Sequence, residues 1–377
     1  MKKLLAMAMA ACMAFTMVAC GGCAASSTAS SAAATSEAAS AESTTGAKTD
    51  VAFVTDVGNI DDRSFNQYTW QGVQDFCTAN GLNANYYRPT EDSDAARIEQ
   101  MDNAVADGAK AIVVAGFLFG SSVAEAQEKY PDVQFLALDV SAGDLGDKTA
   151  ATNTALITYR EEQAGYLAGY AAVTDGYKEL GFLGGMAVPA VIRYGYGFVQ
   201  GADAAAKELG VSDINIKYWY SGGFAATDEV KNKMDGWYSE GTEVVFACGG
   251  PVCESCDAAA QANGGKMIGV DVDQGGQFDT VITSAMKALA NSVNVALTDA
   301  MNNGWKFSET YAGKETTLGA AEDCVGLPME TSKFTAFTQE QYDTLFTAIA
   351  DGSLVVDNSF DAEVKPAVTN VTVDYQG

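Results

Sequence analysis

Three aspartates each follow a short apolar run with the composition of a buried β-strand. Asp56 ends "AFVTD", Asp139 ends "FLALD" and Asp271 ends "MIGVD". Ligands of open α/β sheets bind at the carboxyl ends of the strands, so these carboxylates would face one cleft if two sheets lay opposite each other. A helix cap or turn role for any one of them is the alternative, and three in register favour a shared site.

The absence of histidine from all 377 residues narrows what these carboxylates could do. It excludes Ser-His-Asp and Cys-His catalysis and histidine-ligated metals. Paired carboxylates could still hydrolyse a glycosidic bond, but no residue is set apart as acid or nucleophile. Because one carboxylate accepts two hydrogen bonds from a vicinal diol, hydroxyl recognition is the better interpretation and catalysis the alternative.

The stretch "TDVGNIDDRSFNQ" places one aromatic ring, Phe65, among three acids. Phe65 also opens the inward side of an expected helix, so core packing is the alternative to ligand contact. Asp61 and Asp62 precede this helix and are expected to cap it or to interact with its dipole. The helix is expected to stop at Asn80-Gly81.

Strand and helix patterns alternate along the chain in two runs. The first run has expected strands at 51–55, 84–87, 111–114 and 134–138, with helices between them. The second has expected helices at 161–173, 196–209, 228–239 and 254–263, and expected strands at 180–183, 214–220, 243–246 and 266–270. Two such runs predict an α/β protein with two doubly wound parallel sheets, each covered by helices on both faces.

The N-terminus has the features of an exported protein. Residues 1–19 form a basic start and an apolar run too short for a confident membrane span, and Cys20 follows a small residue. This pattern resembles a bacterial lipoprotein signal with Cys20 as the lipidated residue, and an ordinary secretion signal is the alternative. Residues 20–48, rich in Ala, Ser and Thr, are expected to be a flexible tether.

The formal net charge of −27 limits the partners. Such a surface repels nucleic acid and anionic headgroups, and no phosphate-binding Gly-x-x-x-x-Gly-Lys loop offsets it. A neutral or cationic solute is therefore expected, without nucleic acid and without a cofactor.

Several motifs together resemble the Bmp/PnrA-like (basic membrane protein) family of substrate-binding lipoproteins. They occur in the family's order over nearly the whole chain after residue 50, and they are "VAFVTDVGNIDDRSFNQYTWQGV", "AIVVAGFLFG", "REEQAGYLAGYAA", "LGFLGGMAVPAVIRYGYGFVQGA", "YSGGFAATDEVK", "IGVDVDQ" and "VITSAMKAL". The resemblance implies a type I periplasmic-binding-protein fold with two lobes joined by a hinge. The implied lobes are 49–158 plus about 280–325, and 159–279 plus about 326–377.

The resemblance also implies an aromatic sandwich around a nucleobase. Phe65 would form one wall and Phe224, in "YSGGFAA", the other, from the opposite lobe. Asn66 and Asp139 would contact the base edge, with Asp56 nearby. Stacking on a flat, polarizable base contributes on the order of 1–3 kcal/mol per ring, which makes two rings an effective clamp.

The ribose contacts are implied by two further motifs. Asp271 would accept hydrogen bonds from the diol, and Lys287, on an expected helix, would be a second ribose contact. Gly249 and Gly250 would let the backbone approach the ligand closely.

The loop "CGGPVCESC" departs from the family pattern through Cys248, Cys253 and Cys256. Disulfides or free thiols, with Cys77 and Cys324 as further candidates, are favoured over a metal site, which would want a fourth ligand. No metal is therefore expected.

The expected function is that of an extracytoplasmic, membrane-anchored lipoprotein that captures nucleosides, with purines favoured, for the permease subunits of an ABC importer. The protein is expected to be a monomer and not an enzyme. A sugar-binding receptor of the same fold is the first alternative, and a nucleoside hydrolase is the second.

Overall fold

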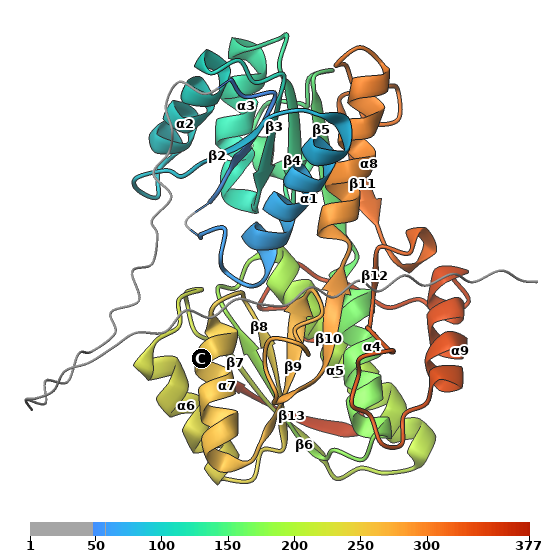
Figure 1. Cartoon of the computed structure of the whole chain (residues 1–377). Coiled ribbons are helices and arrows are strands. Elements are labelled where there is room, and N and C mark those ends of the chain that lie inside the picture. The colour runs from blue at the N-terminus through green and yellow to red at the C-terminus, as the bar shows by residue number, and fades with distance from the viewer. Residues whose placement is uncertain (1–47, 57) are drawn as a thin grey trace, which may run out of the picture. The chain divides into compact units, whose positions relative to one another are not determined.

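The computed structural model of the protein describes residues 48–56 and 58–377, which form two β-sheets flanked by helices (Figure 1). The first sheet has the strand order β11-β5-β4-β3-β1-β2 and the second β12-β10-β9-β8-β6-β7-β13. The pairing is parallel throughout except between β12 and β10. The predicted α/β class with two parallel sheets is confirmed.

The elements of the first sheet come from the N-terminal part and from a later return of the chain. Its strands are β1 (Val51–Val54), β2 (Ala84–Tyr87), β3 (Ala111–Ala115), β4 (Gln134–Leu138), β5 (Thr154–Tyr159) and β11 (Lys314–Leu318). The helices around it are α1 (Phe65–Asn80), α2 (Asp94–Ala106), α3 (Gly120–Lys129), α8 (Leu289–Asn302) and the 3₁₀ turns Phe117–Phe119 and Ala142–Leu145.

The second sheet is built mainly from the middle of the chain. Its strands are β6 (Glu179–Gly184), β7 (Ile214–Tyr220), β8 (Val244–Cys248), β9 (Lys266–Asp271), β10 (Val281–Lys287), β12 (Val325–Gly326) and β13 (Val371–Gln376). The helices are α4 (Glu161–Thr174), α5 (Pro189–Leu209), α6 (Asp228–Ser239), α7 (Val252–Asn263) and α9 (Gln339–Ala350), and a 3₁₀ turn spans Ala320–Glu322.

The central strands are buried on both faces, which explains their continuous apolar runs. In β1, Val51 and Phe53 belong to one hydrophobic cluster, and Ala52 and Val54 belong to another on the opposite face. A parallel strand covered on both sides needs apolar residues at every position, because successive side chains point to opposite faces.

The start and end of α1 follow local signals in the sequence. The Asp62 carboxylate accepts hydrogen bonds from the backbone amides of Ser64, Asn66 and Gln67, at 2.8–3.0 Å, so it caps the helix as predicted. Gly81, with a φ of 64°, ends the helix after Asn80, also as predicted. Phe65 is thereby fixed in the first turn.

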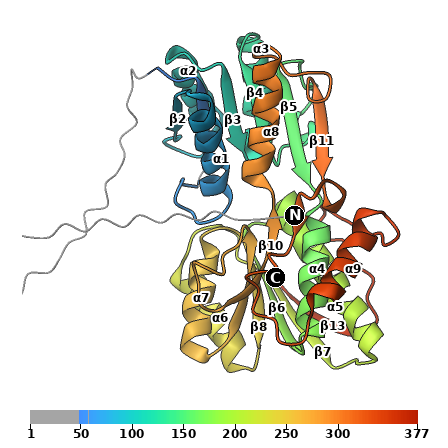
Figure 2. The ribbon, with the colours of Figure 1, turned by 45° about the vertical axis from the view of Figure 1, so that its right-hand side comes forward.

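Three segments carry the chain between the elements of the two sheets: β5 to α4, β10 to α8, and β11 to β12. The second of these is visible in Figure 2, where α8 continues from β10. The predicted lobe bounds remain a prediction. Because β10 lies in the second sheet, a boundary drawn along the sheets would fall after Lys287 and not near residue 280.

Two expectations about secondary structure were wrong. Lys287 lies at the end of strand β10 and not on a helix, since the run Val281–Lys287 is buried between β9 and β12. Helix α5 begins at Pro189 and not at Tyr196. Proline at the first helical position costs no hydrogen bond and has a suitable φ, so it starts a helix where the periodicity alone was ambiguous.

No helix within 48–56 and 58–377 combines the length and the apolar character that a bilayer crossing requires. The predicted signal, residues 1–19, the lipidation residue Cys20 and nearly all of the tether 20–48 lie outside the described residues.

Candidate functional site

The carboxyl ends of three strands bring two aspartates and a lysine together. Asp139 follows β4 of the first sheet, and Asp271 and Lys287 end β9 and β10 of the second. Lys287 Nζ lies 2.5 Å from Asp139 Oδ2 and 3.6 Å from Asp271 Oδ1. The two sheets therefore meet at this point through charged groups. The same groups are those predicted from the sequence to contact one ligand.

Both aspartates have backbone conformations that are uncommon for residues with a side chain. The φ of Asp139 is 53° and that of Asp271 is 66°, in the left-handed region. Aspartate enters this region more readily than bulkier residues do. In both cases this conformation falls at the end of a strand, and the carboxylate has an oxygen within 3.6 Å of Lys287 Nζ.

Lys287 is buried together with a third carboxylate, Glu161, at the start of α4. Glu161 Oε1 lies 3.3 Å from Lys287 Nζ, and the exposed fractions of the two side chains are 0% and 2%. Burial opposes the charge of Lys287, yet Asp139, Asp271 and Glu161 together raise its pKa above its usual value. The ammonium is therefore charged at neutral pH.

The ring of Phe65 lies beside this charge cluster. Lys287 Nζ is 4.7 Å from the Phe65 ring centroid, a cation–π distance. A Cβ built on Gly116 would lie 3.3 Å from Asp56 Oδ2 and 3.8 Å from Phe65 Cε1, so Asp56 and Phe65 border the same glycine. Asp56, Phe65, Asp139 and Lys287 thus form one contiguous group.

Two buried acceptors in this group or next to it have no hydrogen-bond partner among the residues that the structure describes. They are Asn66 Oδ1 and Asp139 Oδ1. The amide nitrogen of Asn66 donates to Asp56 Oδ1 at 3.0 Å and to Asp62 Oδ2 at 3.1 Å, which fixes the orientation of the amide and of its oxygen. A buried acceptor without a donor is costly, so both oxygens suit a ligand that brings N–H or O–H groups.

Burial changes the acidity of the aspartates around Phe65. It raises the pKa of Asp56 above its usual value, with hydrogen bonds from Gly58 and Asn66 acting in the opposite direction. Burial likewise raises the pKa of Asp139 to about 6, although Lys287 favours its ionised form. The Asp139 carboxylate is thus close to titration at neutral pH.

Phe224 lies on the second-sheet side, in the segment between β7 and α6. A Cβ on Gly185 would fall well inside van der Waals contact with Phe224 Cδ1, and a Cβ on Gly249 would lie 3.2 Å from the same atom. The ring therefore packs directly on the backbone of these two residues, and a side chain larger than that of glycine would crowd the ring. Phe65 is the first residue of α1, beside the first sheet, and Phe224 follows β7 of the second sheet. That the two rings face one another remains a prediction.

The contacts of Gly249 are more specific than the close backbone approach that was expected from the sequence. It follows β8, and it lies against the Phe224 ring and the backbone of Gly185, whose amide donates to the Cys248 carbonyl at 2.9 Å. Direct contact between Gly249 and a ligand remains a prediction.

Four residues of this region were not proposed from the sequence as site residues. Ser64 Oγ donates to Asp271 Oδ2 at 2.5 Å, and the side chain of Gln274 donates to the Arg63 carbonyl at 3.1 Å. Glu161 contacts Lys287, and Arg193 Nε lies 2.6 Å from Glu161 Oε2. Glu161 stood in the motif "REEQAGY", but only the folded chain reveals its neighbours.

A cavity of ≈ 310 Å³ lies beside the charge cluster. Asp271 and Lys287 contribute to its wall, together with Tyr68, Met286 and Leu327 among others. Its volume is at the lower end of the range for small-molecule sites.

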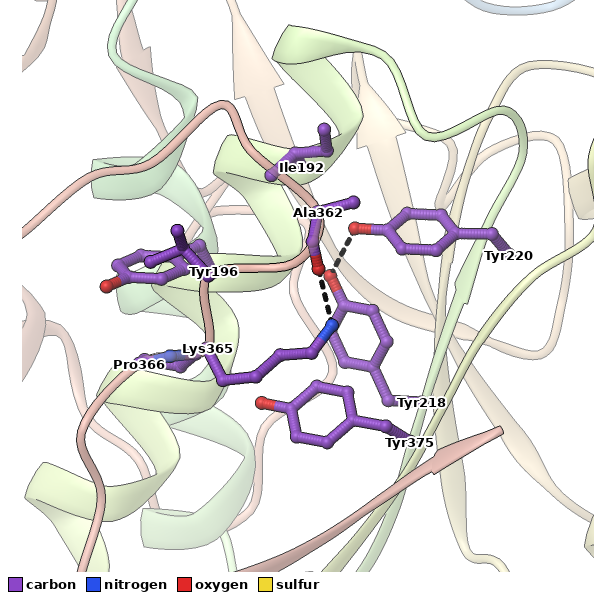
Figure 3. Close-up of a pocket in the computed structure, with 9 residues that line it drawn as sticks. Ile192, Tyr196, Tyr218, Tyr220, Ala362, Lys365, Pro366 and Tyr375 are labelled. Atoms are coloured by element: carbon purple, nitrogen blue, oxygen red, sulfur yellow. Dashed lines mark hydrogen bonds between the residues drawn. The ribbon is translucent and has the colours of Figure 1, made fainter. Parts of the chain in front are cut away.

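A second pocket, shown in Figure 3, is too small for such a ligand. It has ≈ 10 Å³ among Tyr196, Tyr218, Tyr220, Lys365 and other residues near the C-terminus, about the room of one water molecule. The hydroxyls of Tyr218 and Tyr220 lie 2.8 Å apart there. It contains none of the predicted site residues.

The five cysteines in the described part of the chain are free thiols, all of them buried, namely Cys77, Cys248, Cys253, Cys256 and Cys324. Gln274 Nε2 lies 3.7 Å from Cys253 Sγ, and Tyr238 Oη lies 3.5 Å from Cys256 Sγ. Of the two favoured options, disulfides or free thiols, the structure therefore has free thiols. Residues 48–56 and 58–377 contain no cluster of three or more His, Cys, Asp or Glu that could hold a metal ion.

Solved structures support the fold. An ABC transporter system solute-binding protein from Aeropyrum pernix K1 has a TM-score of 0.68 and 21% identity, with 82% of this chain and 94% of that chain covered. One from Conexibacter woesei DSM 14684 has a TM-score of 0.66 and 21% identity, with coverages of 82% and 99%. The chain has the type I periplasmic-binding-protein fold, as predicted.

Named relatives agree in sequence as well. The ABC transporter nucleoside-binding protein BmpA of Lactococcus lactis subsp. cremoris is 31% identical over 242 residues, 60% of this chain and 65% of the relative. The CD4+ T-cell-stimulating antigen of Listeria monocytogenes is 26% identical over 329 residues, 81% and 87% of the two chains. The chain thus spans just under two thirds of the Lactococcus relative and more of the Listeria relative.

The family model described as "ABC transporter substrate-binding protein PnrA-like" matches residues 49–350, which include the first sheet, every strand of the second sheet except β13, and every predicted ligand contact. The resemblance stated from the motifs is therefore confirmed, and the fold and the relatives agree with it. The chain belongs to the Bmp family of ABC transporter substrate-binding proteins.

Proposed function

We propose that this protein captures nucleosides, with purine nucleosides preferred, outside the cytoplasm and delivers them to the permease of an ABC importer. The observation that carries the proposal is the position of the Phe65 ring, 4.7 Å from a lysine ammonium that also contacts Asp139 and lies near Asp271. A nucleoside has a matching arrangement, because its flat base could stack on the ring and the hydroxyls of its sugar could bind the charged groups. The name of the Lactococcus relative supports the same ligand class.

Each part of the ligand has a matching group. Phe65 and Phe224 would stack on the two faces of the base. The open acceptors Asn66 Oδ1 and Asp139 Oδ1 would take N–H donors of the base edge, with Asp56 nearby. A base without those donors would leave buried acceptors unpaired, and this is how the site would discriminate between bases.

The sugar would lie at the second-sheet strand ends. Asp271 would accept from the ribose diol and Lys287 would donate to a ribose oxygen. Asp271 and Lys287 also border the ≈ 310 Å³ cavity, which provides open space next to these groups. The negative net charge favours a nucleoside over a nucleotide.

The site is proposed to bind and not to catalyse. The Asp139, Asp271 and Glu161 carboxylates all face Lys287, so none is arranged as an isolated acid opposite a nucleophile. The protein is proposed to act as a monomer that contacts the permease subunits.

Membrane attachment through a lipid on Cys20 is part of the proposal. Its support is the signal pattern of residues 1–19 and the names of relatives such as basic membrane protein B of Borreliella burgdorferi. Metabolic labelling with a radioactive fatty acid would test it. Label should enter the full chain and be lost in Cys20→Ala, and retention of label in that variant would contradict lipidation at Cys20.

The function is tested by calorimetric titration of the full chain with purine and pyrimidine nucleosides, free bases and ribose. We expect purine nucleosides to bind most tightly. Phe224→Ala should weaken purine nucleoside binding by about 5- to 100-fold, as the loss of one stacking contact implies. Phe360→Ala, a control on a ring that is 70% exposed, should leave affinity unchanged.

Other outcomes would point to the alternatives. If ribose bound as tightly as inosine, the protein would be a sugar receptor, for which the carboxylates at the strand ends would suffice. If inosine released free hypoxanthine over hours in the presence of the protein, the hydrolase alternative would replace the proposal.

A further inference from the structure

Glu161 differs from the other carboxylates around Lys287 because cations of the protein occupy both of its oxygens. Oε1 lies 3.3 Å from Lys287 Nζ, and Oε2 lies 2.6 Å from Arg193 Nε. The Glu161 side chain is completely buried. Asp139, in contrast, has one oxygen on Lys287 and one buried oxygen without a partner in the described chain. Asp139 therefore has a buried oxygen open to a ligand, whereas Glu161 is completely buried and both of its oxygens face cations of the protein.

Glu161 and Lys287 both lie where the chain passes between the elements of the two sheets. Glu161 is the first residue of α4, directly after β5, and Lys287 is the last residue of β10, directly before α8. Helix α4 packs against β10, so this ion pair is made within the second-sheet elements. Asp139 approaches the same ammonium from the first sheet. Glu161 and Asp271 would thus stay with Lys287 if the sheets moved apart, whereas Asp139 would not.

The helices that carry Glu161 and Arg193 pack with their backbones in direct contact. Glycines occupy the contact on α4 and α5, and they are Gly165, Gly169, Gly197 and Gly201. A Cβ on Gly165 would overlap the carbonyl oxygen of Tyr194, and one on Gly197 would overlap that of Glu162. Figure 2 shows the two helices side by side. Such close packing fixes the first turn of α4 relative to Arg193.

The charges in this cluster support one another. Burial alone would raise the pKa of Glu161, but Arg193 and Lys287 hold it below its usual value. Arg193 is 15% exposed, and Glu161 raises its pKa further despite burial. A buried lysine would be strongly destabilising without such partners.

We propose that Glu161 and Arg193 are positioning residues that hold the Lys287 ammonium in place for the sugar hydroxyls of the ligand, without touching the ligand themselves. This inference rests on the proposed nucleoside function. In this proposal, Arg193 orients Glu161 and Glu161 in turn orients Lys287 at the end of the site that would hold the sugar.

The test compares inosine with 2′,3′-dideoxyinosine, which lacks the diol, on the full chain. In Glu161→Gln, inosine affinity should fall by about 10- to 100-fold, the loss expected for a hydrogen bond to a charged group. Affinity for the dideoxy analogue should change little, so the ratio of the two dissociation constants should approach one. In a Lys287→Met background the same substitution should add no further loss.

Glu162→Gln is the matched control, because Glu162 is the next residue and its nearest cation, Arg160, is 3.9 Å away. It should keep the wild-type ratio. Arg193→Lys should keep more of the ratio than Arg193→Leu does. Arg193→Leu also serves as the second variant should Glu161→Gln fail to fold, as judged by circular dichroism.

A readout without ligand keeps this inference separate from the proposed function. In ligand-free protein labelled with ¹³C-lysine, the Lys287 Cε resonance at pH 7 should move in Glu161→Gln relative to the wild type, because the ammonium loses one of its three carboxylate neighbours. Equal losses for both ligands, an unchanged ratio, or an unmoved resonance would overturn the inference. If the wild type bound no nucleoside, the proposed function would fail. The resonance alone would then show whether Glu161 positions Lys287.

Discussion

The Lys287 ammonium and the Asp139 carboxylate are 2.5 Å apart, although they end strands of different sheets and are separated by 148 residues in sequence. A second contact of this kind joins Ser64, before α1, to Asp271, at the end of β9. The polar groups proposed to hold the ligand are therefore also groups through which the two sheets touch. Ligand binding and the relative position of the sheets should be coupled at these residues.

Lys287→Met should strongly destabilise the fold. The substitution leaves the buried carboxylates of Asp139 and Glu161 without their ammonium partner, and breaking a buried ion pair in this way costs about 3–5 kcal/mol. Chemical denaturation of the wild type and the variant would measure the loss. Lys178→Met, which removes an exposed ion pair with Asp213, should have little effect. Equal losses in the two variants would contradict the proposed role of the cluster.

Gly185→Ala should weaken nucleoside binding through Phe224. The added methyl group would occupy the place of the ring edge, so the ring would have to move away from its position on the backbone. A misplaced ring should forfeit much of its stacking energy, and we expect a loss of about 5- to 100-fold in inosine affinity. Isothermal titration calorimetry would measure it.

The control for this substitution is Gly236→Ala, on helix α6, where an added Cβ meets no atom within 4 Å. It should leave inosine affinity unchanged. If Gly185→Ala also bound inosine as the wild type does, Phe224 would not be part of the base site in its present position.

Local signals in the sequence predicted much of the fold. Asp62 caps α1 and Gly81 ends it, as expected, because a cap and a stop depend on residues within one turn. The strands that lead to Asp56, Asp139 and Asp271 were found because strands buried on both faces are apolar throughout. Asp139 and Asp271 both lie close to one ammonium, and a ligand cleft shared by the three aspartates remains a prediction.

The parts that sequence reasoning missed depend on contacts between distant segments. Lys287 was expected on a helix, but the run Val281–Lys287 pairs with β9 and β12 and is a strand. Arg193 lies in the turns of α5 that were not expected to be helical. Its pairing with Glu161 joins two helices, 32 residues apart, so no local pattern could reveal it.

Inosine affinity should decrease as the pH falls below 6. Burial raises the pKa of Asp139 to about 6, so above that pH the carboxylate is ionised, and it can hold Lys287 and accept from the base. Below it, protonation removes the charge opposite Lys287 and converts one acceptor into a donor. Titrations between pH 5 and 8 would measure this, and Asp139→Asn should bind more weakly at pH 8 with a flatter profile. A wild-type affinity that is constant over this range would contradict the assignment.

Glu162→Gln should change how the stability of the fold depends on pH. Burial raises the pKa of Glu162 to about 7, well above its ordinary value of 4.5. The folded chain therefore holds this proton more tightly than the unfolded chain does. Its contribution is fully present below about pH 4.5 and is lost as the pH rises through 7.

Glutamine cannot ionise, so the variant should lose less stability than the wild type between pH 5 and 8, and it should melt a few degrees higher at pH 8. Calorimetric melting curves at several pH values would show the difference. Glu330→Gln, at an exposed position, provides the comparison. Parallel pH profiles for the wild type and Glu162→Gln would mean that the pKa of Glu162 is the same in the folded and unfolded chains, which would contradict the prediction.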